Sequence, residues 1–331
     1  MENNSLNIAI TGEKGFIAQN LITEITRRGH KFISLLSVDI LPYKNKKGEP
    51  CVYRNNKSLW SRTFKEKNID VVIHNAAVVG TDVVALNSKK AVNTNLLGTQ
   101  NITEAANEAG ILNVYIGTTV IYDTPRYQDS LIYENSVINP STHYAVQKYA
   151  GEMTVKNSAK EWLVLRPLFA YGGVGDPNSL IAKTIYSVKN NIKNVDMFLD
   201  PEKMKDYMHV FTFCDAIVSA IESNERNNDF NVSVESPKKT SEIIQEISIQ
   251  LNKKIDVLNW HPQTDYLGNH LLSCEKFRSK IGFSREPITL QEGIALSIAG
   301  IENDITDYNP LVYLEEARNK NVDLLSYFPK K

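Results

Sequence analysis

The segment that decides the fold reads Thr11-Gly12-Glu13-Lys14-Gly15-Phe16-Ile17-Ala18. It follows a short apolar run, residues 6–11 (LNIAIT), and leads into residues 16–28, where apolar side chains recur at helical spacing. Gly12 can adopt a backbone conformation that is closed to other residues, and Gly15 lets the main chain approach a pyrophosphate. The helix behind them offers free N–H groups and the positive end of its dipole. The spacing G-x-x-G-x-x-A therefore predicts a strand, a tight turn and a helix that cradle a dinucleotide, with contacts from Gly12, Lys14, Gly15, Phe16 and Ile17.

Strands and helices alternate after this turn. Strands are predicted at residues 31–36, 71–74, 113–117 and 162–165, and helices at residues 57–67, 88–109 and 144–158. Such alternation implies parallel pairing with right-handed crossovers, hence an α/β fold with a doubly wound parallel sheet of the Rossmann type. The pattern loosens beyond residue 167, where a helix at 180–189 and a short strand at 206–210 are predicted. We expect a dinucleotide-binding domain over residues 1–167 and a smaller α/β part over residues 168–331, which mainly binds substrate, with a soft boundary that allows return crossings.

The final stretch, residues 302–331, holds too many large apolar side chains for a free tail. These side chains are Tyr308, Tyr313, Tyr327 and Phe328. We expect this stretch to pack on the body of the protein.

The composition excludes several classes of protein. Over 331 residues, 37 Lys and Arg balance 38 Asp and Glu, so no global field draws the chain to nucleic acid or to an anionic membrane. Cys51, Cys214 and Cys274 lack C-x-x-C spacing and the histidines are scattered, so neither a disulfide framework nor a metal site is indicated. The polar start, and the absence of an apolar run of roughly 20 residues, argue against secretion and membrane insertion. We expect a cytoplasmic protein.

The end of the second predicted strand offers two kinds of side chain for an adenosine ribose. By strand register this place is Leu36 or Ser37, with Asp39 close behind. An Asp hydrogen-bonds the ribose hydroxyls and repels a 2′-phosphate, whereas a small hydroxyl residue admits the phosphate. NAD and NADP both stay open as the cofactor, and the absence of an Arg directly after Ser37 favours NAD.

A phenol and an ammonium stand one helical turn apart in Tyr144-Ala145-Val146-Gln147-Lys148. An adjacent cation favours the phenolate, and lowering the pKa of a tyrosine by about three units takes roughly 4 kcal/mol. Such a tyrosine can exchange the proton of a carbinol while a hydride moves to or from a nicotinamide. Because Y-x-x-x-K also occurs on ordinary surface helices, the pair needs support from the rest of the chain.

Further motifs supply that support. After the glycine turn come His74-Asn75-Ala76-Ala77, Asn95-Leu96-Leu97-Gly98-Thr99, Thr118-Thr119-Val120-Ile121-Tyr122, the pair of Tyr144 and Lys148, and Leu165-Arg166-Pro167. The C-terminal half adds Asp206-Tyr207-Met208-His209-Val210, Phe230-Asn231-Val232 and Leu290-Gln291-Glu292-Gly293-Ile294. This succession resembles the extended short-chain dehydrogenase/reductases, specifically the NAD-dependent epimerase/dehydratase family that acts on nucleotide sugars. The resemblance covers most of the chain.

The resemblance implies roles for particular residues. Tyr144 and Lys148 would be catalytic together with Thr118, which would hydrogen-bond the reacting oxygen; Thr119 is the alternative to Thr118. Tyr144 and Asn95 would also contact the cofactor, and Lys148 would hydrogen-bond the nicotinamide ribose. Asn95 would steady the strand beside Thr118, or serve only as a structural helix residue. The cofactor groove would be lined by Ala76, Ala77 and Pro167.

Departures from the family pattern bear on the reaction and the substrate. Ala18 replaces the third glycine of the turn, which is a mild change. Thr119-Val120 stands where family dehydratases commonly carry Asp-Glu, so elimination of water is disfavoured. Phe169 stands where an Asn is frequent, so an expected side-chain contact to the sugar or pyrophosphate is missing.

A sugar nucleotide carries about two negative charges, which a neutral protein must meet with local groups. Candidate substrate contacts are Thr119, His143, Phe169 and Arg278, with Lys183, Lys189, Lys203 and Lys205 as further cations. Each cation could equally be a solvated surface charge, and His143 could serve only as a helix cap.

These observations predict redox chemistry at a ring carbon, with C4 favoured, of a nucleoside-diphosphate sugar. An epimerase would oxidise the carbinol with NAD and return the hydride to the other face, whereas a ketoreductase would use the same residues once and consume NAD(P)H. A non-catalytic dinucleotide sensor is a third hypothesis.

Family members pair through a four-helix interface, here the helices at 88–109 and 144–158, so a homodimer is predicted.

Overall fold

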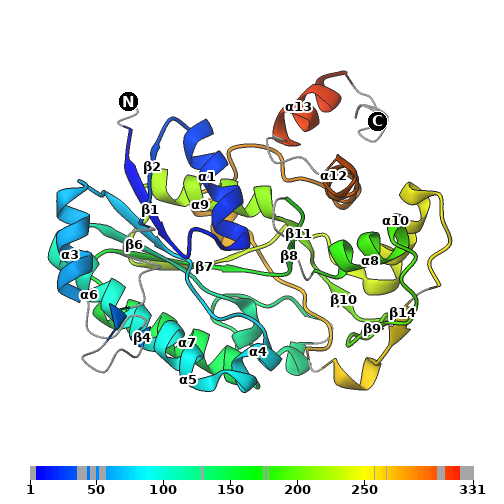
Figure 1. The fold of residues 1–331 in the computed structure, drawn as a ribbon, viewed down its shortest axis with the longest axis horizontal. Helices are drawn as coiled ribbons and strands as arrows, with labels where there is room; N and C mark the ends of the chain where they lie inside the picture. The colour runs from blue at the N-terminus through cyan, green and yellow to red at the C-terminus, as the bar shows by residue number, and fades with distance from the viewer. Residues whose placement is uncertain are drawn as a thin grey trace.

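Six parallel strands form the central sheet of the computed structural model (Figure 1). The structure describes residues 5–35, 43–44, 50–51, 57–127, 130–173, 176, 179–256, 258–265, 267–303 and 310–320. The strands follow the order β12-β7-β6-β5-β1-β2, and each neighbouring pair is parallel. Their bounds are β1 Asn7–Thr11, β2 Lys31–Ile33, β5 Val71–His74, β6 Leu112–Ile116, β7 Trp162–Pro167 and β12 Asn228–Val232. The predicted doubly wound Rossmann sheet is confirmed.

Helices cover both faces of this sheet (Figure 1). On one face, α1 (Phe16–Arg27) packs against α9 (Val210–Glu222). On the other face lie α3 (Lys57–Glu66), α6 (Thr99–Ala109) and α7 (His143–Ser158). Every residue of β5 and β6 is buried between these layers. A strand covered on both faces needs apolar side chains on both sides, which explains the unbroken apolar runs in the sequence.

The helix predicted at residues 88–109 forms in three consecutive segments. They are α5 (Ser88–Val92), a π-helical stretch (Asn93–Gly98) and α6. Backbone angles at both junctions stay in the right-handed helical region, so the helix continues through the widened turn. Such π turns are frequent at functional sites, and this one carries Asn95.

Three pairs of short strands build the second part of the molecule, together with α8 (Leu180–Lys189), α10 (Thr240–Leu251) and α12 (Leu290–Asn303). The pairs are β8 (Ala170–Tyr171) with β11 (Met208–His209), β9 (Val195–Met197) with β14 (Leu258–Trp260), and β10 (Met204–Lys205) with β13 (Lys238–Lys239). After residue 167 the chain returns to the first part of the molecule. There β12 joins the six-stranded sheet and α9 packs beside α1 on one face of that sheet. The assignment of residues 1–167 to the dinucleotide and 168–331 to the substrate stays a prediction about function.

The remaining elements are short. They are β3 (Tyr43–Lys44) paired antiparallel with β4 (Pro50–Cys51), α4 (Thr81–Leu86), α11 (Glu275–Lys280) and 3-10 turns at Thr119–Ile121, Thr124–Tyr127 and Pro262–Thr264.

Two predicted strands are shorter than expected. The strand predicted at 31–36 ends at Ile33, because the amide of Leu35 donates to the carboxylate of Glu13. The strand predicted at 206–210 is reduced to Met208–His209, which pairs with Ala170–Tyr171, and the side chain of Asp206 accepts hydrogen bonds from the amides of Val234 and Glu235.

The C-terminal helix α13 (Pro310–Lys320) packs on the body, as expected for the tail. Leu314 and Ala317 are both 2% exposed and join the main core. The guanidinium of Arg318 makes two hydrogen bonds to Glu292 of α12, at 2.6 and 2.7 Å. Residues 304–309 and 321–331 lie outside the described part, so the expectation for Tyr308, Tyr327 and Phe328 is not addressed.

Within the described ranges, no helix combines the length and the apolar character needed to cross a bilayer. The same residues contain no group of three or more His, Cys, Asp or Glu side chains that could hold a metal ion.

A buried ionic network joins α7 to the sheet. Arg166 on β7 is 1% exposed and forms a two-pronged hydrogen bond to Glu152 of α7, at 2.9 and 2.6 Å. The same guanidinium donates to Asp229 of β12 at 2.5 Å and to the hydroxyl of Tyr122 at 2.8 Å. Since Glu152 is also 1% exposed, its charge depends on Arg166 for compensation.

Replacing this arginine tests the network. Arg166→Met keeps most of the volume but removes both hydrogen bonds of the buried Glu152 carboxylate and leaves it only Lys156, whose Nζ is 3.9 Å away, so we expect the free energy of unfolding to fall by about 3–5 kcal/mol. Urea unfolding followed by circular dichroism measures it. Arg126→Met is the control, because Arg126 is 59% exposed and 3.7 Å from Asp123; it should change stability by about 0.5 kcal/mol or less. Equal urea midpoints for the two variants would show that Arg166 does not stabilise the buried Glu152 carboxylate.

Candidate active site

The glycine turn has the backbone geometry of an anion cradle. Gly12 has a φ of +67°, and its carbonyl accepts a hydrogen bond from the amide of Gly15 at 2.8 Å. A side chain at Gly12 would meet the Cα of Ala76 at 2.9 Å, so the end of β5 approaches as closely as glycine allows. Gly15 is the exposed N-cap of α1, no side chain caps that helix, and its first turn has no acidic residue. Free amides and the helix dipole are thus available to a diphosphate, so the turn fits the predicted dinucleotide.

A buried imidazole holds the strand ends beneath this turn. His74 Nδ1 is 2.8 Å from the hydroxyl of Thr11, and His74 Nε2 is 3.0 Å from the hydroxyl of Thr99. Burial, with a smaller effect from Lys148, lowers the pKa of His74 to about 3. The ring is therefore neutral at physiological pH and can donate to one hydroxyl while it accepts from the other. This bridging role of His74 was not predicted from the sequence, although a polar residue that ends a buried strand is a usable signal.

Asn95 ties the segment after β5 to α7. Its Oδ1 accepts a hydrogen bond from the amide of Val78 at 2.8 Å, and its Nδ2 donates to the Val78 carbonyl at 3.1 Å and to Gln147 at 2.9 Å. Ala76 and Ala77 lie just before this anchored residue. These bonds give Asn95 a positioning function, and its contact with a cofactor stays a prediction.

Lys148 docks α7 on the end of β6. Its Nζ donates to the Ile116 carbonyl at 2.7 Å and lies 4.2 Å from the centre of the Tyr115 ring. In return the Tyr115 hydroxyl donates to the Lys148 carbonyl at 3.1 Å. Tyr144, half-buried one turn earlier on α7, is thereby held beside the strand end that leads to Thr118.

Burial changes the charge of this lysine. Desolvation lowers the pKa of Lys148 from 10.5 to about 7, and the nearby Glu152 only partly opposes the shift. Near neutral pH, the side-chain amine of Lys148 is therefore protonated in about half of the free protein molecules. The sequence alone suggested a fully charged lysine. The cation that favours a Tyr144 phenolate is present mainly at and below this pH.

The two threonines after β6 have different surroundings. Thr118 is 8% exposed and caps the 3-10 turn, with its hydroxyl 3.4 Å from the amide of Val120. Thr119 is fully buried, and its hydroxyl donates to the Pro167 carbonyl at 3.3 Å. Since the Thr119 hydroxyl is already engaged with β7, this arrangement favours Thr118 as the residue that meets the reacting oxygen.

The predicted substrate residues fall into separate regions. His143 is the exposed first residue of α7. Phe169 stacks on Tyr207, with ring centres 5.4 Å apart, and the Nζ of Lys205 lies 5.7 Å from the centre of the Phe169 ring. Arg278 is 42% exposed and 3.1 Å from the carboxylate of Glu235. Of the other cations, Lys183 is exposed, whereas Lys205 is fully buried and paired with Asp265. Lys189 and Lys203 are half-buried.

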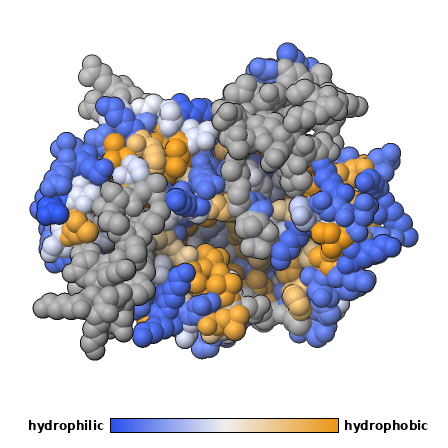
Figure 2. All heavy atoms as spheres, viewed as in Figure 1, coloured by the Kyte–Doolittle hydropathy of each residue, from blue (hydrophilic) through white to orange (hydrophobic). Residues whose placement is uncertain are grey.

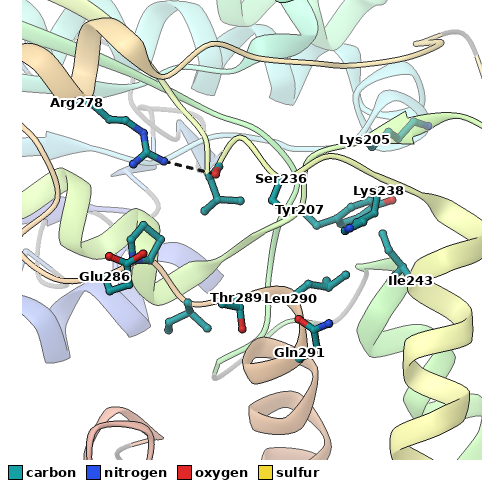
Figure 3. Close-up of a pocket in the computed structure, with 13 residues that line it drawn as sticks. Lys205, Tyr207, Ser236, Lys238, Ile243, Arg278, Glu286, Thr289, Leu290 and Gln291 are labelled. Atoms are coloured by element: carbon teal, nitrogen blue, oxygen red, sulfur yellow. Dashed lines mark hydrogen bonds between the residues drawn. The ribbon is translucent and has the colours of Figure 1, made fainter. Parts of the chain in front are cut away.

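A cavity of about 270 Å³ brings two of these cations together. In Figure 3, Arg278 approaches it from one side and Tyr207, Lys205 and Lys238 from the other. The guanidinium of Arg278 donates to the Val234 carbonyl at 3.5 Å, which is the dashed line in the view. The start of α12 closes the cavity with Thr289, Leu290 and Gln291. His143 is not among its described lining residues.

Ser37 and Asp39, the two alternatives for the adenosine ribose, lie outside the described residues. The choice between them is therefore not addressed by the structure.

The family model for the NAD dependent epimerase/dehydratase family matches residues 8–233, about two thirds of the chain. The chain belongs to this family. The match runs from β1 to the residue after β12, so it includes the glycine turn, Thr118 and the Tyr–Lys helix.

Relatives of the chain are named as enzymes of different reactions. A putative UDP-glucose 4-epimerase of Methanocaldococcus jannaschii is 25% identical over 310 residues, which cover 90% of this chain and 99% of that protein. A dTDP-D-glucose 4,6-dehydratase of Dictyostelium discoideum is 26% identical over 255 residues, 69% of this chain and 58% of that protein.

Solved structures share the fold of this chain. MoeE5 in complex with UDP-glucose and NAD superimposes with a TM-score of 0.76 at 22% identity, over 90% of this chain and 99% of that one. The UDP-glucose 4-epimerase of Thermus thermophilus in complex with NAD has a TM-score of 0.75 at 23% identity, over 91% of this chain and all of that one. The expected resemblance and the Rossmann fold are both confirmed.

The lowered pKa of Lys148 predicts a pH-dependent effect on stability. Because the folded-state pKa, about 7, is below the ordinary 10.5, the unfolded chain binds more protons between these values, and burial of Lys148 costs less as the pH rises. Lys148→Met removes this contribution. The free energy of unfolding of the variant relative to the wild type should therefore fall by roughly 2 kcal/mol between pH 7 and pH 9.

Urea unfolding at intervals of half a pH unit measures this difference. For Lys183→Met, which replaces an exposed lysine of α8, the same difference should be independent of pH. A flat profile for both variants would show that Lys148 keeps an ordinary pKa.

Proposed function

We propose that this protein is an NAD(P)-dependent nucleotide-sugar epimerase that removes and returns a hydride at a ring carbon, with C4 favoured. The observation that carries the proposal is the bond from Lys148 Nζ to the Ile116 carbonyl, at 2.7 Å. It fixes the helix of Tyr144 against the strand that ends two residues before Thr118. The glycine turn follows the carboxyl end of β1 in the same parallel sheet, and parallel strands end at one edge. The phosphate cradle and the proton-transfer residues therefore share one crevice.

The chain's own residues supply the proton chemistry. Tyr144, as a phenolate, takes the proton of the sugar hydroxyl and later returns it, and the Thr118 hydroxyl hydrogen-bonds the same oxygen. Lys148 orients the site and, while protonated, favours the phenolate. Bound NAD would accept the hydride from the carbinol carbon and return it to the opposite face. Between these steps the sugar must turn over while its nucleotide end stays bound.

The cavity beside Tyr207 is the proposed place for the nucleoside diphosphate. Its lining holds three cationic side chains, Lys205, Lys238 and Arg278, against the one carboxylate of Glu286, and this excess of positive charge suits a ligand with about two negative charges. Lys205 and Arg278 already pair with Asp265 and Glu235, so they would bind phosphate as parts of ion-pair networks rather than as isolated charges. The similarity to relatives that are named as UDP-glucose and dTDP-glucose enzymes supports the same class of substrate.

Elimination of water is disfavoured. No carboxylate follows Thr118, and the hydroxyl of Thr119 is held by the Pro167 carbonyl. A ketoreductase would use Tyr144, Lys148 and Thr118 in the same way, and differs in whether the cofactor stays bound between turnovers.

Tyr144→Phe tests the proposed chemistry. Loss of the phenol hydroxyl should lower kcat by about 10²–10⁴-fold while NAD binding is kept, because the phenyl ring stays in place and the other predicted cofactor contacts remain. The assay is the interconversion of UDP- and dTDP-sugars with their C4 epimers. The wild type and Tyr144→Phe should both release near-stoichiometric NAD on denaturation.

Tyr186→Phe, on the exposed surface of α8, is the matched control and should keep full activity. Full turnover in Tyr144→Phe would refute the assigned role. A protein that is purified empty but binds NADPH on titration would instead be the ketoreductase.

Support for the homodimer comes from apolar side chains on the outer helices. In the view of Figure 2 hydrophobic atoms gather at the lower centre, around the position of α4 and α5. Exposed apolar residues on α4, α5, the π turn and α7 are Val83, Leu86, Val92, Leu97 and Val146. The first and last of these helices pack side by side, so a second copy could bury them in a four-helix interface.

Light scattering after gel filtration tests the interface. The wild type should elute at twice the chain mass of 37.3 kDa, and Val146→Glu should shift it toward the monomer, because the charge would be buried without a partner. Ile249→Glu, which alters an exposed apolar residue of α10, should leave the dimer intact. A monomeric wild type would rule the dimer out.

A further inference from the structure

A buried carboxylate stands inside the glycine turn. Glu13, between Gly12 and Lys14, is only 6% exposed. Its Oε1 accepts a hydrogen bond from the Ser34 hydroxyl, and its Oε2 accepts one from the Leu35 amide, both at 2.8 Å. The side chain therefore crosses from the first turn to the two residues that follow β2. This position is neither a helix cap nor a surface charge.

The end of β2 is the place where dinucleotide folds hold the adenosine ribose. An acidic side chain there usually accepts hydrogen bonds from the ribose hydroxyls. β2 is the neighbour of β1 in parallel register and ends at Ile33. The next residues are Ser34, which is uncharged, and Leu35, which is fully buried. Within the described residues, the carboxylate at this strand end comes from the turn and not from the strand.

We propose that Glu13 binds the adenosine ribose and thereby selects NAD over NADP. The inference rests on the proposed function, because it requires that the turn binds a dinucleotide. Each carboxylate oxygen can accept more than one hydrogen bond, so the oxygens that hold Ser34 and Leu35 can also accept from a ribose diol. A 2′-phosphate offers no such donors and carries about −1.5 to −2 charges near neutrality. It would meet a fixed negative charge and lose the hydrogen bonds.

Lys14 acts in the opposite direction, since a cation beside the turn attracts a 2′-phosphate. Lys14 is exposed, however, so its charge is screened by water and salt. The carboxylate of Glu13 is held in place by two hydrogen bonds and shielded from solvent, so its effect on a neighbouring phosphate is the larger one.

Glu13→Gln removes the charge and keeps the shape. The amide oxygen of Gln can accept from the Leu35 N–H, and its NH₂ group can donate to the Ser34 oxygen, so both local hydrogen bonds survive. Glu13→Ala is a second variant that lacks the carboxylate altogether. Glu66→Gln, which changes a glutamate with a 68% exposed side chain on α3, is the matched control. Asp39→Asn tests the competing carboxylate that follows in the sequence.

Each protein is first freed of bound NAD and then titrated with NADH and with NADPH. The Kd is read from the quenching of tryptophan fluorescence, and circular dichroism checks the folding. The wild type should bind NADH at least tenfold more tightly than NADPH. Glu13→Gln and Glu13→Ala should each narrow this ratio by tenfold or more, while Glu66→Gln and Asp39→Asn keep it.

Each contrary result has a distinct meaning. Equal affinities or a preference for NADPH in the wild type overturns the inference without any variant. If the Glu13 variants keep the preference for NADH over NADPH, or if Asp39→Asn alone loses this preference, the inference about Glu13 is overturned while the proposed function stands. Absence of any dinucleotide binding by the wild type overturns both.

Discussion

The close approach of Gly12 to Ala76 is the constraint on which the candidate site depends. Only a glycine lets the turn after β1 lie this near the end of β5, because a methyl group would sit 2.9 Å from the neighbouring Cα. Thr11 and His74 hold the same two strand ends together with a buried hydrogen bond of 2.8 Å. This contact and the free amides at the start of α1 are the features on which the proposed dinucleotide site rests.

Buried polar bonds from three elements give the Tyr–Lys helix one position. Lys148 reaches the carbonyl of Ile116 on β6, Glu152 reaches Arg166 on β7, and Gln147 receives a hydrogen bond from Asn95 on the π turn. Each of these groups would be costly to bury alone, so a displacement of α7 would break several bonds at once. This preorganisation is what a proton transfer requires, since the tyrosine must meet its partner at hydrogen-bond distance.

Burial also decides the charge of two residues near the candidate site, His74 and Lys148. His74 becomes a neutral bridge between two hydroxyls, because desolvation lowers its pKa to about 3. Lys148 has a pKa of about 7 in the same environment, so its charge responds to pH in the physiological range. The pKa values of these two residues are thus set by their buried positions, and the residue type alone would not reveal them.

The sequence by itself determined the features that depend on neighbours along the chain. The strand, turn and helix around Gly12, the helix of Tyr144 and Lys148 and the alternation that implies a parallel sheet all follow from local periodicity and turn chemistry, and they were predicted correctly. The order of the motifs was also enough to identify the family. Only the tertiary structure decided which distant groups meet: Glu13 with Leu35, Asn95 with Val78, and β12 with the main sheet after the chain had left it. These contacts join residues that are many positions apart, and they arise because buried hydrogen-bonding groups must find partners in the packed fold, wherever the chain brings them.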